Sequence, residues 1–218
     1  MTGKRGFTVE QGRFEALWGR SVGTDAAPAF AALERGYAEP HRRYHTAAHI
    51  KHCLRQFDLA AAEMDAPDQV ELAIWFHDVI YRPGAGDNER RSADLLLKLM
   101  GERVAPELRA AVDDLIMVTV HPVPPRTADQ RYVVDIDLSS FGLPWKEFLR
   151  DSVAVREEFP HLSDAEFYPG QCKFLEALIA RPHFCYTEFF RARHEQRARD
   201  NIRGYLQALR TTGAPPAL

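Results

Sequence analysis

Cysteine is scarce in this sequence, and the few cysteines are far apart. Three occur in 218 residues, at Cys53, Cys172 and Cys185, and none forms a Cys-x-x-Cys pair. A disulfide framework or a thiolate zinc site is therefore not expected. Such sparing use of cysteine fits a reducing compartment, so we expect a cytoplasmic protein.

Long apolar runs are also missing. A membrane-spanning helix needs about 18 or more consecutive apolar residues, and no such stretch occurs. The residues before Gly19 contain no apolar core of the kind found in signal peptides. The sequence therefore predicts neither a membrane partner nor a secretion signal.

An excess of positive charge is absent too. Lys and Arg number 28 against 31 Asp and Glu, which gives a net charge of −3 and a pI near 6.3. Proteins that bind nucleic acids usually carry a basic patch or stripe, and the pair Arg42–Arg43 is too short to form one. We expect no nucleic-acid polymer as a partner.

Runs of strand-forming residues are few, and the clearest, at 132–134, is too short to support a sheet. Helical periodicity dominates instead and predicts an all-α fold. The expected helices cover residues 7–19, 28–38, 46–64, 67–78, 88–100, 106–121, a segment holding 135 and 137 that stops at Gly142, 144–159, 163–180 and 187–209. With 45% hydrophobic residues, one helical domain over 1–210 followed by a flexible tail over 211–218 is expected.

The dipeptide His77–Asp78 interrupts an almost wholly apolar run, AIWFHDVIY at 73–81. Burying an unpaired carboxylate carries a large desolvation cost, and a buried imidazole needs hydrogen bonds. The dipeptide therefore predicts a partner, which is either a cation held by both side chains or a neutralising hydrogen-bond network.

Other metal-binding side chains lie on either side of this dipeptide. His45 and His49 flank a helix start for which Thr46 is a plausible N-cap, and His49 borders the apolar stripe begun by Ile50. Downstream, two carboxylates lie in another apolar helix, at Asp135 and Asp137. Imidazoles combined with carboxylates suit a divalent cation, for which Mn, Fe, Co, Ni, Zn or Mg are the options.

The order His, His-Asp, Asp on successive helices resembles the HD superfamily of metal-dependent phosphohydrolases, and more specifically a bacterial subgroup of it. The matching pieces cover most of residues 44–202 and are YHTAAHI at 44–50, FHDVIY at 76–81, DNERRSA at 87–93, TVH at 119–121, DIDL at 135–138, VREE at 155–158 and ARDN at 198–201. The resemblance implies a single HD-type helical bundle. It also implies a set of metal ligands: His49, His77, Asp78 and Asp137, with Asp135 as the rival of Asp137.

Catalytic roles follow from chemistry and position. A carboxylate such as Asp78 can bind metal while orienting a water, and Glu89 follows the site helix by one loop, so we expect it to line the rim of the site. The arrangement around His45 resembles cyclic-nucleotide phosphodiesterases, in which the earlier histidine protonates the leaving oxygen, although those enzymes have Asn where this chain has Thr46. The expected activity is hydrolysis of a phosphate ester, mono- or diester, in a small phosphorylated metabolite or nucleotide, by metal-activated water.

Two other functions stay open at this stage. HD-type scaffolds also hold di-iron oxygenases, which need further histidine ligands and would make His121 decisive. A non-catalytic nucleotide or metal sensor is the third reading. Arginines that are candidates for binding the phosphate are Arg90, Arg91 and Arg156. A homodimer is compatible with the sequence, which leaves the oligomeric state open.

Overall fold

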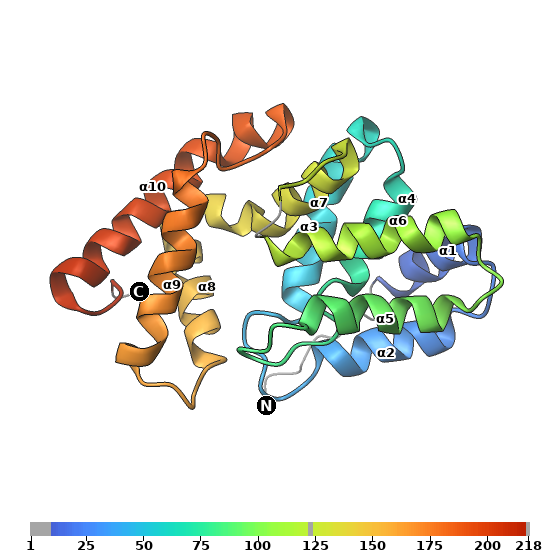
Figure 1. Cartoon of the computed structure of the whole chain (residues 1–218), viewed down its shortest axis with the longest axis horizontal. Coiled ribbons are helices and arrows are strands. Elements are labelled where there is room, and N and C mark those ends of the chain that lie inside the picture. The colour runs from blue at the N-terminus through green and yellow to red at the C-terminus, as the bar shows by residue number, and fades with distance from the viewer. Residues whose placement is uncertain (1–9, 122–123, 217–218) are drawn as a thin grey trace. The chain divides into compact units, whose positions relative to one another are not determined.

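This computed structural model describes residues 10–121 and 124–216. Within those residues the chain forms ten α-helices and three short 3-10 helices, and no strand (Figure 1). The predicted all-α class is thereby confirmed. No helix in the described residues is both long and apolar enough to span a membrane.

The chain divides into two compact units, Met1–Val134 and Asp135–Leu218, and the boundary falls within one helix, α7. A compact unit need not be a separate folding domain, so the single domain over 1–210 stays a prediction. The first unit contains α1 (Gln11–Ser21), α2 (Ala27–Tyr37), α3 (Ala47–Ala60), η1 (Ala61–Glu63), α4 (Pro67–Phe76), α5 (Asn88–Met100), α6 (Pro106–Met117), η2 (Val118–Val120) and most of α7 (Ala128–Asp137). The second contains η3 (Leu138–Gly142), α8 (Trp145–Glu157), α9 (Asp164–Ala180) and α10 (Glu188–Thr212).

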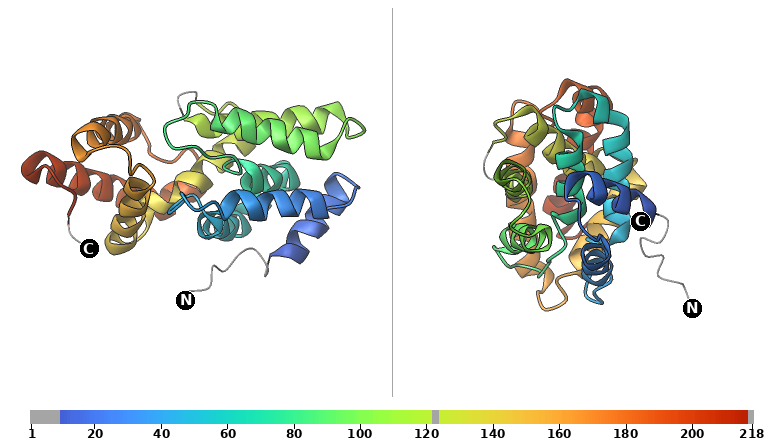
Figure 2. Two further views of the ribbon diagram at one scale, coloured as in Figure 1. Left: turned by 90° about the horizontal axis from the view of Figure 1, so that it is seen from below. Right: turned by 90° about the vertical axis from the view of Figure 1, so that its right-hand side faces the viewer.

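Helix α4 is the centre of the first unit, where it packs against α1, α3, α5 and α6. Every residue from Val70 to Phe76 is buried, as expected for a helix that is apolar around its whole circumference. The one acidic residue in this stretch, Glu71, accepts hydrogen bonds from Arg13 Nε at 2.7 Å and from Trp75 Nε1 at 3.3 Å. Helices α5 and α6 run side by side in both ribbon views (Figure 2).

The second unit is organised around α10, which packs on η3 and α9. Asn201 of α10 donates hydrogen bonds to the carbonyl oxygens of Phe141 and Leu143, both at 2.8 Å, and so fastens the helix to η3. A Cβ atom at Gly142 would lie 2.6 Å from Nδ1 of His194. The absence of a side chain at Gly142 therefore permits this close packing.

Several predicted helix ends are confirmed because their signals are local. The Thr46 side chain accepts a hydrogen bond from the Ala48 amide, and Thr187 caps α10 in the same way through Phe190. Ser163 and Glu166 form a capping box at the start of α9. Gly101 ends α5 with a φ of 77°.

Other boundaries differ from the prediction. α4 stops at Phe76, so His77 and Asp78 follow the helix and do not form its last turn. The helix predicted over 46–64 ends at Ala60 and continues as a 3-10 turn, and α10 extends past Leu209 to Thr212. The strand-like residues 132–134 are helical, because buried packing within α7 outweighs β propensity. The predicted start of the first helix at residue 7 lies outside the described residues.

Candidate metal centre

Three ligand atoms converge in the first unit, from His49 on α3 and from His77 and Asp78 just after α4. His49 Nε2 lies 3.3 Å from His77 Nε2 and 3.7 Å from Asp78 Oδ2, and His77 Nε2 lies 3.1 Å from Asp78 Oδ2. Two ligand atoms that bind one cation at about 2.1 Å lie roughly 3.0 to 3.4 Å from each other. The cluster is buried and could hold a metal ion.

The end of α4 fixes the orientation of the His77 ring. The His77 amide donates to the carbonyl of Ala73 at 2.8 Å, which closes the last helical turn. Its ring Nδ1 lies 3.0 Å from the carbonyl oxygen of Ile74, an acceptor that requires the proton on Nδ1. In the neutral ring the lone pair is then on Nε2, which faces His49 and Asp78, as in metal sites where a backbone carbonyl orients a ligating histidine. In the protonated ring the same Nε2 carries a proton and donates to Asp78 Oδ2.

Asp78 is held in its charged form. Burial by itself raises the pKa of this carboxyl group, but the charges of His77, His45 and His49, with a hydrogen bond from His77, together lower the pKa well below its usual value. An ionised carboxylate that is only 13% exposed favours a cationic partner.

His45 lies close to this cluster, since its charge is among those that lower the pKa of Asp78. Its ring stacks on that of Tyr81 with the centroids 4.1 Å apart. The ring of Tyr44 is perpendicular to it, with the centroids 4.9 Å apart. The centroid of His49 is 6.0 Å away. The structure therefore brings His45, His49, His77 and Asp78 together, while the catalytic role of His45 stays a prediction.

Glu89 lies in the first turn of α5 and forms no hydrogen bond or ion pair with any described residue. Two buried residues of the same helix, Asn88 and Ser92, fasten the segment that follows Asp78. Asn88 bonds both the amide and the carbonyl of Arg82, at 2.9 and 3.0 Å, and Ser92 Oγ accepts from the Ile80 amide at 3.0 Å. The start of α5 is thus tied to the His77–Asp78 segment, and the catalytic role of Glu89 stays a prediction.

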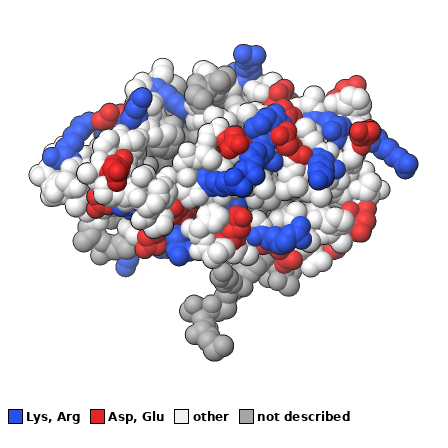
Figure 3. Space-filling view, turned by 60° about the horizontal axis from the view of Figure 1, so that its bottom comes forward, with Lys and Arg blue, Asp and Glu red and all other residues white. Residues whose placement is uncertain are grey.

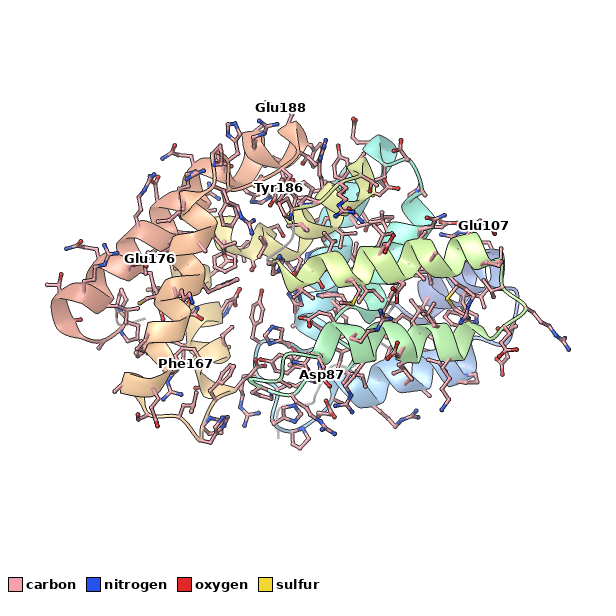
Figure 4. All side chains as sticks on the ribbon, in the orientation of Figure 1. Asp87, Glu107, Phe167, Glu176, Tyr186 and Glu188 are labelled. Carbon is pink, nitrogen blue, oxygen red and sulfur yellow. The ribbon has the colours of Figure 1, made fainter. Side chains whose placement is uncertain are left out.

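Asp135 and Asp137 belong to the second unit. The carboxylate of Asp135 is buried and accepts hydrogen bonds from the amides of Tyr186 and Thr187 and from Thr187 Oγ1, at 2.7 to 2.8 Å. Tyr186 and Glu188, labelled in Figure 4, mark the start of α10. Asp135 therefore anchors a helix start. Asp137 is half-buried at the end of α7, and its role as fourth ligand stays a prediction.

Two of the candidate phosphate-binding arginines make structural ion pairs. Arg90 bonds Asp113 and, at 3.0 Å, Asp94, which links α5 to α6. Arg156 bonds Asp164 at 2.8 Å and the carbonyls of Phe159 and Leu162. His121, the residue on which a two-metal site would depend, follows η2 in a left-handed conformation with a φ of 67°.

Two residues beside the site were missed by sequence reasoning. The Sγ atom of Cys53 lies 3.6 Å from His49 Nε2, and a spacing of four residues in α3 was a signal for that proximity. Arg42 is buried next to Asp78 and is bonded to backbone carbonyls. No sequence pattern indicated it, because its contacts with the segments around His45 and Asp78 are to main-chain atoms.

The charged side chains agree with the composition: on the face drawn in Figure 3, positive and negative groups are interspersed. Comparison with known proteins adds no family, since no family model, curated protein or solved structure matches the chain. The chain is an all-helical protein with a buried cluster of His49, His77 and Asp78 that could bind metal.

Proposed function

We propose that the protein is a metal-dependent hydrolase of phosphate esters, acting on a small phosphorylated metabolite or nucleotide. The observation that supports this most is the convergence of His49 Nε2, His77 Nε2 and Asp78 Oδ2 within 3.1 to 3.7 Å of one another. The three residues also stand in the order His, then His-Asp, that resembles the HD superfamily.

In this proposal, His49, His77 and Asp78 hold a divalent cation and Asp137 completes the ligand set. Asp135 is the weaker candidate for that fourth position, because three donors in its own unit already engage its carboxylate. Two imidazoles and a carboxylate form a mixed nitrogen and oxygen donor set that suits Mn, Fe, Co, Ni or Zn. Such a cation supplies an acidified water and neutralises charge on a phosphoryl group.

Three side chains of the protein have the remaining roles in this proposal. Asp78, ionised at neutral pH, accepts a hydrogen bond from the attacking water and so orients it. His45 donates a proton to the departing ester oxygen, a task that histidine side chains commonly perform in enzymes. Glu89 lines the rim of the site and offers a carboxylate that no other described side chain engages.

The direct test is a substrate screen on purified protein loaded with Mn²⁺ or Co²⁺. The panel contains phosphomonoesters, nucleoside mono-, di- and triphosphates, and cyclic mono- and dinucleotides, and the readout is phosphate or product release. We expect at least one substrate to be hydrolysed, and we expect that activity to disappear with chelation and in His77→Ala.

Metal analysis, O₂ uptake and nucleotide-binding measurements on the purified protein test the two other readings. Two irons per chain with a substrate reaction that consumes O₂ would indicate a di-iron oxygenase. Tight binding of one nucleotide without release of any product would indicate a sensor. Either outcome would contradict hydrolysis as the function.

A further inference from the structure

Arg42 is a cation buried beside the candidate metal centre. Its side chain is 0% exposed, yet it lies in the segment between α2 and α3, outside any helix. Buried arginines are rare unless their donors are satisfied, and a guanidinium group has five N–H bonds to satisfy. The partners of Arg42 therefore indicate what this buried charge does.

Those partners come from two separate segments of the first unit. Arg42 Nη1 donates to the carbonyl oxygen of Asp78 at 2.6 Å and to that of His45 at 3.1 Å. Arg42 Nη2 donates to the carbonyl oxygen of Val79 at 2.9 Å. One guanidinium group thus joins the segment that precedes α3 to the segment that follows α4.

The surroundings of Arg42 fix its position and compensate its charge. Glu39 accepts from both Nε and Nη2, at 3.0 and 2.8 Å, so the cation has an ionic partner. The guanidinium carbon lies 5.2 Å from the ring centroid of Tyr37 and 5.4 Å from that of Tyr81, within the range of cation–π attraction. Tyr81 carries the stacked ring of His45 as well, so the same aromatic side chain contacts both residues.

We propose that Arg42 is a positioning residue of the metal centre, which holds Asp78 at the distance from His45 that the site needs. Its catalytic consequence rests on the function proposed above, because it assumes that His45 and Asp78 act on one substrate. The effect on metal binding does not depend on that function. Lysine cannot replace Arg42, since one ammonium nitrogen cannot span three carbonyls and a carboxylate with the planar fork of a guanidinium group.

The experiment compares Arg42→Lys with the wild type and with Arg109→Lys. Arg109 is a control in the same unit, because its Nη1 donates to two carbonyl oxygens, those of Leu97 and Gly101, both at 2.7 Å, and neither of these acceptors belongs to the site. Co²⁺ affinity is measured by titration, the visible Co²⁺ spectrum reports ligand geometry, and circular dichroism reports folding. Glu39→Gln, at a half-exposed position, loosens Arg42 without removing it.

We expect Arg42→Lys to lower Co²⁺ affinity by about tenfold or more, the usual size of effects from residues that orient metal ligands, and to change the Co²⁺ spectrum. Glu39→Gln should change the Co²⁺ affinity and spectrum in the same direction as Arg42→Lys but to a smaller extent. Arg109→Lys should match the wild type in both. Wild-type affinity and spectrum in Arg42→Lys would overturn the proposal, as would equal losses in Arg109→Lys.

Two further results change which measurement tests the proposal about Arg42. If circular dichroism shows that Arg42→Lys is unfolded, Glu39→Gln carries the test, and unchanged affinity in that variant overturns the proposal. A wild type that binds Co²⁺ but hydrolyses no phosphate ester contradicts the proposed function only. The affinity comparison still tests Arg42 in that case.

Discussion

Single atoms decide what the His49, His77 and Asp78 cluster can do. The contact of His77 Nδ1 with the carbonyl of Ile74 directs Nε2 toward the site, and the neighbouring imidazoles keep Asp78 ionised. Neither property follows from the presence of a His-Asp dipeptide. The sequence predicted which residue types gather here, whereas their tautomer and charge depend on partners that only the folded chain supplies.

His45→Ala is expected to separate catalysis from metal binding. The His45 ring is not among the three converging ligand atoms, so the variant should keep the wild-type metal content. Loss of a general acid should lower kcat by about 10²-fold or more with the best substrate. Metal analysis and steady-state kinetics measure the two effects, with His183→Ala at an exposed position as control. An unchanged kcat would rule out the proton-donor role.

Asp135 predicts a distinct pH dependence of stability. Burial raises the pKa of this carboxyl group from 3.8 to about 6, although hydrogen bonds from Thr187 and the Tyr186 amide act in the opposite direction. The folded state therefore binds more protons than the unfolded state between these values, so the contribution of Asp135 to the free energy of unfolding falls as the pH rises from about 4 to 6. At 1.36 kcal/mol per pKa unit, the full loss is about 3 kcal/mol.

Urea unfolding of wild type and Asp135→Asn at a series of pH values measures this effect. The variant lacks the titrating group, so its stability should decline less over the same interval, while contributions from other groups cancel in the comparison. Parallel stability curves for the two proteins would show that Asp135 titrates at its ordinary value.

At the scale of helices, local signals gave most of the boundaries. Caps such as Thr46 and Ser163 act within one turn of the chain, and a sequence pattern can therefore indicate them. The end of α4 at Phe76 was not indicated, since the apolar run continues to Tyr81. The groups that a further helical turn would use are engaged by other elements: the carbonyl of Trp75 accepts from the Tyr37 hydroxyl, and the amide of Ile80 donates to Ser92 Oγ.

The contact between α2 and this segment gives a further prediction. A Cβ atom at Gly36 would clash with the carbonyl oxygen of Val79, which is backbone next to Asp78. Gly36→Ala must therefore displace the segment, at a cost of about 1–3 kcal/mol in the free energy of unfolding, and should weaken metal binding. Chemical denaturation and Co²⁺ titration measure both effects.

Gly19→Ala is the matched control for this substitution. Gly19 is also helical, in α1, and a Cβ atom there has no neighbour within 4 Å. Alanine should stabilise α1 by about 0.5–1 kcal/mol and leave metal affinity unchanged. If Gly36→Ala behaved like Gly19→Ala, the close packing of α2 on Val79 would be contradicted.

At the scale of the molecule, periodicity predicted the all-α class but did not predict a division into two units. The boundary falls inside α7, which continues without a break from Val134 to Asp135. No Pro, Gly or charge run marks that point, so composition offered no signal. The three converging ligand atoms all lie in the first unit, and Asp137, the fourth ligand of the proposal, lies in the second.

The central claim is that His49, His77 and Asp78 bind a metal ion, and metal stoichiometry tests it most directly. The wild type, His77→Ala, Asp78→Ala and the control His183→Ala are loaded with Co²⁺, desalted and analysed for metal per chain by mass spectrometry. We predict about one ion or more in the wild type and the control, and loss of it in both site variants, with folding verified by circular dichroism. Full metal content in both His77→Ala and Asp78→Ala would contradict the claim.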